Sequence, residues 1–155
     1  MRLNNGYIAL TDSRWCKYCR EDNIKQVCIW TRKKSFKVCM IGDPIFFLEK
    51  GTRLIQGYGI FKSFHTISLQ ESWNKYGISL GAADFPSLLN ILGVRPTDSN
   101  LNKDLGIIQI EMTKWFNPSF NIDDLQIDFH KAIVSGKRIS SVDIQKILNC
   151  EKKLD

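Results

Sequence analysis

The sequence lacks a hydrophobic run long enough to cross a membrane, and its first residues lack an apolar segment. Its 155 residues hold nothing close to the roughly 20 consecutive apolar residues that a membrane helix needs. The opening residues 1–6 are mostly polar, so a secretory signal is not expected. These absences predict a cytoplasmic protein that makes no contact with a membrane.

The sequence has few histidines, and it contains a single closely spaced pair of cysteines. The five cysteines include one C-x-x-C motif, Cys16 to Cys19, and the two histidines, His65 and His130, lie far apart. A zinc site normally needs a second pair of ligands, and a thioredoxin-like motif needs a βαβ context. An odd number of cysteines without a signal peptide is typical of reduced thiols. We therefore expect structural thiols and no cofactor, with a thiol or metal protein as the alternative.

No internal repeat or low-complexity tract divides the chain. A mass of 17.9 kDa, with 43% hydrophobic and 25% charged residues, is typical of one globular domain. We expect a single domain over residues 1–150, followed by a tail or the start of a linker at 151–155.

The positive charge is concentrated in one part of the chain. The net charge is +6, and residues 31–63 hold seven basic residues against two acidic ones. These basic residues are Arg32, Lys33, Lys34, Lys37, Lys50, Arg53 and Lys62. A localised basic face is typical of a protein that binds a polyanion, although a solvated lysine-rich surface is the alternative.

Short apolar segments between turn residues predict five or six strands. They are expected at 7–10, 26–30, 35–38, 45–48, 54–61 and 105–110. Gly57 and Gly59 lie two apart and therefore on one face, which predicts a tight bend or the close approach of another backbone or of a ligand. Phe46 and Phe61 are expected in the core. The pair at 115–116, near a proline, is expected to form a small cluster under a loop.

Capping residues predict four short helices. The clearest begins after Ser68, because the side chains of Ser68 and Glu71 can each satisfy the other's backbone N–H, and it ends at Gly77. The others are expected to begin near Asp12, to run from 84 to 93, and to run from 141 to 148. Strands and helices in this non-alternating order predict an α+β domain whose sheet curls into a barrel.

Several motifs, taken in order, resemble one group of domains. They are Leu10-Thr11-Asp12-x-x-Trp15, Cys28-Ile29-Trp30, Phe36-Lys37, Gly42-Asp43-Pro44-Ile45-Phe46-Phe47 and Ile55-x-Gly57-Tyr58-Gly59-Ile60-Phe61. This order resembles the PUA-like domains of the EVE, YTH and SRA group, and most of all the version in front of HNH nucleases in modification-dependent restriction enzymes. The resemblance continues through 68–77, 106–108 and 133–137, so it covers nearly the whole chain.

The resemblance implies a fold and a function. The fold is a PUA-like, EVE-like curled β-barrel of five to six strands surrounded by short helices. The function is that of a non-enzymatic reader, which flips a modified base of double-stranded DNA (5-methylcytosine, 5-hydroxymethylcytosine or N6-methyladenine) into an aromatic cage. The implied partner is an HNH nuclease domain, fused C-terminally or acting in trans, since His65 and His130 cannot supply its ligands. RNA binding, as in tRNA-modifying PUA relatives, is the alternative.

The resemblance and the local sequence together suggest residues for the base pocket. We expect Trp30 and Phe64 to form its walls, although Trp30 has a core role as its alternative. Trp15 and Tyr58 are further candidates, with a core position as the alternative for Trp15 and an exposed strand position as the alternative for Tyr58. Asp12 is expected to accept a hydrogen bond from an exocyclic amine, or else to cap a helix.

The seven basic residues of 31–63 are expected to contact phosphates, with Lys137 and Arg138 as a second edge. Such contacts contribute affinity and salt dependence rather than sequence selectivity.

Overall fold

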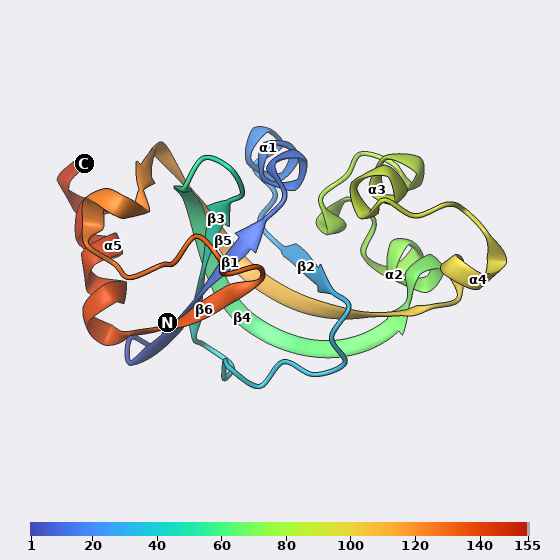
Figure 1. Cartoon of the computed structure of the whole chain (residues 1–155), viewed down its shortest axis with the longest axis horizontal. Coiled ribbons are helices and arrows are strands. Elements are labelled where there is room, and N and C mark those ends of the chain that lie inside the picture. Colours follow the sequence, from blue (N-terminus) through green and yellow to red (C-terminus); the bar gives the residue numbers. More distant parts are fainter. Residues whose placement is uncertain (155) are drawn as a thin grey trace.

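The computed structural model describes residues 1–154, and the side chains of residues 1–152. Its elements are β1 (Asn5–Thr11), α1 (Ser13–Glu21), β2 (Val27–Thr31), β3 (Pro44–Glu49), β4 (Leu54–Ser68), α2 (Leu69–Tyr76), η1 (Gly77–Leu80), α3 (Phe85–Leu92), α4 (Asp98–Leu101), β5 (Asp104–Asn121), η2 (Ile122–Leu125), β6 (Gly136–Ser140) and α5 (Ser141–Leu154) (Figure 1). None of the helices described here is long and apolar enough to cross a membrane. Asp155, the last residue of the expected tail, lies outside the described residues.

All six strands belong to one mixed sheet, in the order β2-β5-β4-β3-β1-β6. The β1–β3 pair is parallel, and the other pairs are antiparallel. Figure 1 shows that β4 and β5 are long and strongly curved, and that the helices surround the sheet. Within residues 1–154 the edge strands β2 and β6 do not pair with each other, so the curled sheet remains open. The predicted α+β fold with a curled sheet is confirmed.

Two glycines allow β4 and β5 to approach closely. A Cβ atom at Gly57 would clash with the backbone carbonyl of Lys114, and one at Gly59 would clash with the side chain of Ile110. The pairing of β4 with β5 shifts register beside both glycines, which is the mark of bulges that bend a strand. The predicted close approach is confirmed.

The predicted helix starts are also found. The side chains of Asp12, Ser68 and Asp84 cap α1, α2 and α3, and each accepts a hydrogen bond of 2.8–3.2 Å from a backbone N–H two or three residues later. Gly93 follows α3 with a φ of 68°, a conformation that glycine adopts at little cost. The last helix, α5, begins where predicted but continues past residue 148 to Leu154.

One predicted strand, at 35–38, is wrong. This segment belongs to the loop 32–43, which pairs with no strand of the described chain. Its Phe36 and Val38 instead pack onto the sheet, and the carbonyl of Val38 accepts a hydrogen bond from the Asn5 side chain at 3.0 Å. The alternation of polar and apolar residues thus reflects a loop that covers the core.

The interpretation of Trp115 and Phe116 is also wrong. Both lie in β5, and Phe116 is buried in a main core cluster beside Phe46. Pro118 had suggested a loop, but it lies where β5 departs from regular pairing, between the pairs Gly57↔Trp115 and Ile55↔Phe120. A missing N–H costs no ladder hydrogen bond there. Strand β6 was not predicted, because three of its five residues are glycine or basic.

Apolar residues pack into clusters on both sides of the sheet. Phe46 and Phe61 are buried as predicted, at 0% and 6% exposure. Trp73 is partly buried and stacks on Phe85, with ring centroids 5.8 Å apart. The cluster under α1 contains Trp15 and forms the base of the site described next.

Candidate functional site

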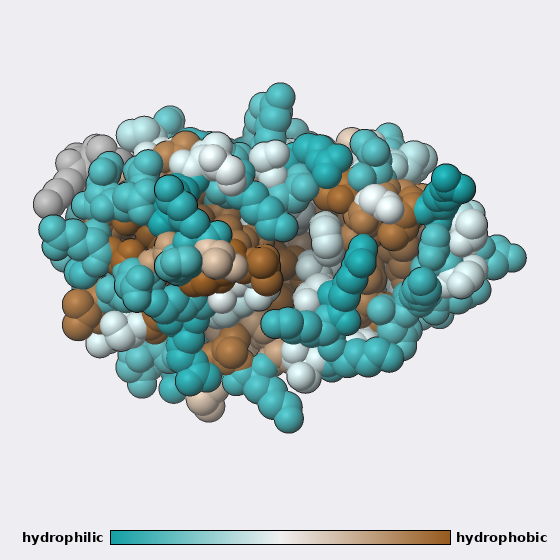
Figure 2. Space-filling model, viewed as in Figure 1, coloured by the Kyte–Doolittle hydropathy of each residue, from teal (hydrophilic) through white to brown (hydrophobic). Residues whose placement is uncertain are grey.

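A cavity of about 330 Å³ opens where the ends of β1 and β2 face each other across the concave side of the sheet. It is also bordered by α1, by the loop after β2, by α3 and by the loop before β6. Figure 2 shows this face of the molecule hollowed near its centre, with apolar side chains inside the hollow and hydrophilic ones around it. The curl of the sheet therefore produces a concave site from segments that are far apart in sequence.

Aromatic side chains form much of the wall. Trp30, Trp15, Tyr7 and Phe36 all line the cavity. Trp30 is half-buried, so part of its ring is accessible. Trp15 is only 2% exposed, and its Nε1 donates to the carbonyl of Cys28 at 3.0 Å, so it presents little more than an edge. Phe36 meets Tyr7 edge-on, with ring centroids 5.3 Å apart.

The structure brings together three of the five residues expected in the base pocket. Trp30, Trp15 and Asp12 line the same cavity, whereas Phe64 and Tyr58 do not. Phe64 lies behind Phe36, with ring centroids 6.2 Å apart. Tyr58 packs elsewhere, between Phe46 and Phe116.

Sequence reasoning missed Tyr7 and Phe36 as wall residues. Phe36 was assigned to a strand, although its position just after a run of basic residues was a signal that it lies near the charged surface. Tyr7 alternates with the core residues of β1, but nothing in the sequence shows what lies above that face.

Asp12 lies at the rim and also caps α1. It accepts hydrogen bonds from the backbone N–H of Arg14 at 2.8 Å and from its guanidinium at 3.1 Å. Burial tends to raise the pKa of Asp12, but the hydrogen bonds and charge of Arg14 outweigh it and lower the pKa below its ordinary value. Asp12 is therefore ionised at neutral pH. A carboxylate offers about four lone-pair positions, and Arg14 occupies three of them, so a ligand amine would share Asp12 with Arg14.

Tyr7 and Ser135 add polar groups to the lining. Burial raises the pKa of the Tyr7 hydroxyl, and a hydrogen bond with the Ser135 side chain only partly opposes this, so the hydroxyl keeps its proton. The backbone carbonyl of Ser135 accepts a hydrogen bond from the Leu10 N–H at 2.9 Å, which fixes this loop against β1.

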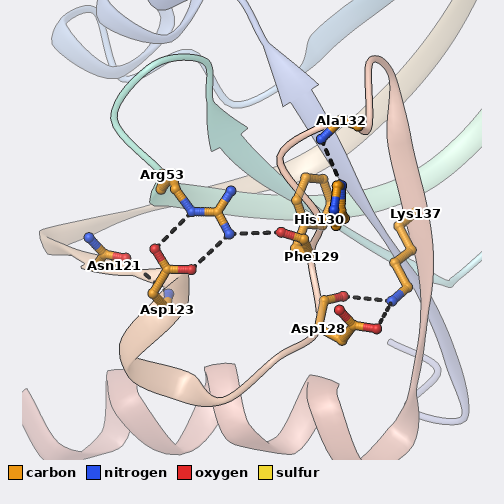
Figure 3. A network of polar contacts seen from close by, with 8 residues as sticks. All are labelled: Arg53, Asn121, Asp123, Asp128, Phe129, His130, Ala132 and Lys137. Atoms are coloured by element: carbon orange, nitrogen blue, oxygen red, sulfur yellow. Dashed lines mark hydrogen bonds and ion pairs between the residues drawn. The ribbon is translucent and has the colours of Figure 1, made fainter.

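Figure 3 shows how the segment leading to Ser135 is held. Lys137 donates to the backbone carbonyl of Asp128 at 2.6 Å and forms an ion pair with its carboxylate at 3.5 Å. The backbone N–H of Ala132 donates to Nδ1 of His130 at 3.0 Å. Lys137, expected at a second basic edge, thus braces this segment, while Arg138 is exposed on β6.

Basic side chains border the cavity, near the ends of both β1 and β2. Arg32, Lys33 and Lys50 line it and are exposed to solvent. The other exposed lysines expected at phosphates, at positions 34, 37 and 62, lie outside its lining. None of these six residues forms an ion pair with another residue of the described chain. Their charges are therefore available to an anionic ligand.

Arg53 differs from the other six. Its guanidinium binds both carboxylate oxygens of Asp123, at 2.8 and 2.7 Å, and donates to the carbonyl of Phe129 at 2.8 Å (Figure 3). This engagement favours a structural role for Arg53 over the expected phosphate contact.

The cysteines of the C-x-x-C motif are buried. Cys16 is 1% exposed and Cys19 is 0% exposed. Burial raises the pKa of Cys16 to about 12 and raises that of Cys19 as well. A reactive thiol or a metal ligand needs the opposite shift. Within the described residues, no three His, Cys, Asp or Glu side chains form a group that could hold a metal ion.

Comparison with known proteins gives structural matches only. No family model and no curated protein matches the sequence. The similar solved structures include the ASCH protein of Zymomonas mobilis and two single-substitution variants of it. One variant has a TM-score of 0.68 and 9% identity over 97% of this chain and 99% of that chain. The second has 0.67 and 10% over 93% and 96%, and the unsubstituted protein has 0.64 and 11% over 92% and 94%.

These similarities show the fold. ASCH domains are PUA-like, so the predicted PUA-like fold is confirmed over almost the whole chain. At such low identity they show nothing further, and the resemblance to EVE, YTH and SRA readers rests on the sequence motifs alone.

Proposed function

We propose that this domain binds nucleic acid and takes one unstacked base into the cavity between β1 and β2. One observation carries the proposal: an aromatic-walled cavity lies directly beside Arg32, Lys33 and Lys50, cations without an ion pair in the described chain. A base has two flat faces that stack on an aromatic ring, and its phosphates need positive charge nearby. A volume of about 330 Å³ is at the lower end of the range for small-molecule sites, which suits a single base.

The polar groups of the cavity suit a base that carries an amino group. Asp12 is an ionised acceptor, and Tyr7 has a neutral hydroxyl that can donate or accept. Cytosine and adenine present an exocyclic amine, whereas thymine and uracil do not. Guanine also carries an exocyclic amine, so the cavity favours cytosine, adenine or guanine over thymine and uracil.

The finer form of the proposal is a reader of modified bases in double-stranded DNA. Ile29, Ile91 and Ile108 line the cavity and offer apolar contact to an added methyl group. The sequence resemblance supports a role as the specificity domain of a modification-dependent restriction system, with an HNH nuclease domain fused or in trans. RNA binding is the second candidate, since an aromatic wall beside cations serves an unpaired RNA base equally well. That the domain binds without catalysis stays a prediction.

The test is binding measured by fluorescence anisotropy. The probes are duplexes of one sequence with cytosine, 5-methylcytosine, 5-hydroxymethylcytosine, adenine or N6-methyladenine at the centre, and single-stranded DNA and RNA of that sequence. Trp30→Ala is expected to weaken binding by about 1–3 kcal/mol, the usual contribution of one stacked base. Trp73→Ala is the matched control, because Trp73 packs against Phe85 and does not line the cavity.

The outcomes separate the candidates. If Trp30→Ala binds as tightly as the unsubstituted protein, the base-pocket proposal is wrong. Equal affinity for every modification removes the modified-base reader, and a preference for RNA over all the duplexes selects the RNA-binding alternative.

A further inference from the structure

A second cavity adjoins the first one. Its volume is about 390 Å³, and it lies between the start of α2, the end of α3, α4 and the start of β5. Arg32 lines both cavities, so its side chain lies between them. We infer that the second cavity binds the neighbouring nucleotide of the same strand and selects a base with an exocyclic amino group. This inference rests on the function proposed above.

The second cavity has an apolar floor. Leu69 and Leu92 line it and are 3% and 8% exposed, and Val94 and Leu105 complete the apolar part. An apolar surface of this kind can cover the face of a base, although it lacks the aromatic ring of the first cavity. The first cavity is therefore expected to supply most of the stacking energy, and the second cavity to supply selectivity.

Cations connect the two cavities. Lys34 and Lys103 line the second cavity and are exposed, and Arg32 lines both cavities. None of the three forms an ion pair with another residue described in the structure. A phosphodiester that joins a base in each cavity would pass beside Arg32, where a positive charge lowers its electrostatic energy.

Besides its three cations, the second cavity is lined by two side chains that can accept hydrogen bonds. The side-chain nitrogen of Asn100 donates one of its two N–H groups to the carbonyl of Arg95 at 2.9 Å, and its amide oxygen can accept a hydrogen bond from a ligand. Asp104 lines the cavity, and its carboxylate has no ion pair within the described residues. The exocyclic amine of adenine, cytosine or guanine has two N–H groups, one for each acceptor. An unpaired thymine has a single N–H, at N3, and leaves one acceptor without a partner.

The inference is tested with labelled single-stranded DNA. In one set of probes the base on the 5′ side of a central cytosine is adenine, cytosine, guanine or thymine, and in a second set the base on the 3′ side is varied. On one of the two sides, thymine is expected to bind at least about 5-fold more weakly than adenine or cytosine. Asp104→Asn is expected to abolish this difference. Lys103→Ala is expected to reduce the slope of log affinity against log salt by about 0.7.

Two comparisons make the result decisive. Asp124→Asn makes the same charge change at an exposed position that lines neither cavity, and it should leave the base preference intact. If Asp104→Asn retains the preference, or Lys103→Ala retains the slope, while Trp30→Ala loses affinity, the inference is overturned and the proposed function stands. If the duplexes of the first experiment bind but no single-stranded probe does, this inference is overturned and the proposed function stands. If no probe of either experiment binds, or if Trp30→Ala binds normally, the proposed function fails and this inference fails with it.

Discussion

The indole of Trp15 in α1 donates a hydrogen bond to the backbone carbonyl of Cys28 in β2 at 3.0 Å. This bond is buried and joins two walls of the first cavity. The same indole packs against Phe47, with ring centroids 5.2 Å apart, and occupies the space that a Cβ atom at Gly81 would need. The position of β2 relative to α1 therefore depends on one side chain.

Trp15→Phe is expected to lower the free energy of unfolding. The substitution keeps an aromatic ring but leaves the carbonyl of Cys28 without its partner, and a buried unsatisfied group costs about 1–3 kcal/mol. Urea denaturation monitored by circular dichroism measures the change. Trp73→Phe serves as the control, because no hydrogen bond of the Trp73 indole is lost there. Equal losses in the two variants would show that the Trp15 hydrogen bond contributes nothing measurable.

Arg53→Ala and Lys50→Ala are expected to have different effects. Arg53 holds Asp123 and the carbonyl of Phe129, so its loss should lower the melting temperature and leave the salt dependence of nucleic-acid binding unchanged. Lys50 lines the cavity without an ion pair in the described chain, so its loss should reduce that salt dependence and leave the melting temperature unchanged. Thermal unfolding and binding at several salt concentrations measure both effects. If Arg53→Ala instead reduces the salt dependence of binding, this would support the expected contact between Arg53 and a phosphate.

The Arg53–Asp123 pair also predicts an acid dependence. The hydrogen bond from Arg53 lowers the pKa of Asp123 below its ordinary value of 3.8. The stability that the pair contributes is thus fully present above pH 3.8 and is lost as pH falls through the lower, folded-state pKa. Asp123→Asn should remove this part of the acid dependence in thermal unfolding, and an unchanged profile would contradict it.

The buried thiols predict a loss of stability at high pH. Burial raises the pKa of Cys16, Cys28 and Cys39 from 9.0 to about 12. Above pH 9 the unfolded chain releases these protons while the folded chain retains them, so stability should fall as pH rises from 9 towards 12. At pH 8 a thiol reagent should modify Cys150, which is only half-buried, before the four buried cysteines. Rapid modification of Cys16 would instead support the alternative that the C-x-x-C motif is reactive.

Gly57→Ala is expected to be strongly destabilising. Its Cβ would clash with the backbone carbonyl of Lys114, which cannot move without disturbing the pairing of β4 with β5. Forcing an extra group into a packed interior costs about 1–3 kcal/mol. Gly51→Ala is the comparison, because no atom lies within 4 Å of its Cβ position and only the positive φ of 86° opposes the change. Urea denaturation should give a lower free energy of unfolding for Gly57→Ala than for Gly51→Ala. The reverse order would contradict the close approach of β4 and β5 at Gly57.

Local signals in the sequence located most of the fold. Ser68 and Asp84 cap helices where predicted, because a cap depends on neighbours within three residues. The segment at 35–38 and the Trp115–Phe116 pair were misassigned, since strand pairing depends on partners far away in sequence. A local pattern cannot report whether such a partner exists.

The site was predictable to a similar extent. Trp30 and Arg32 were identified because a strand with an aromatic residue runs directly into a basic turn. Tyr7 and Phe36 come together only when the loop 32–43 folds back over β1, and no local motif indicates that contact. For the same reason the sequence did not indicate that Arg53 is engaged by Asp123, seventy positions later.

The first cavity is assembled from Tyr7, Trp30, Ile91 and Ser135, which span most of the chain. Because these segments come from distant parts of the chain, the cavity exists only when the whole domain is folded. A molecule that occupies it must draw the unfolding equilibrium towards the native state by mass action. For the same reason, a substitution that destabilises a distant part of the core would lower the apparent affinity for the ligand. The melting temperature measured with the ligand present therefore depends on the stability of the entire domain.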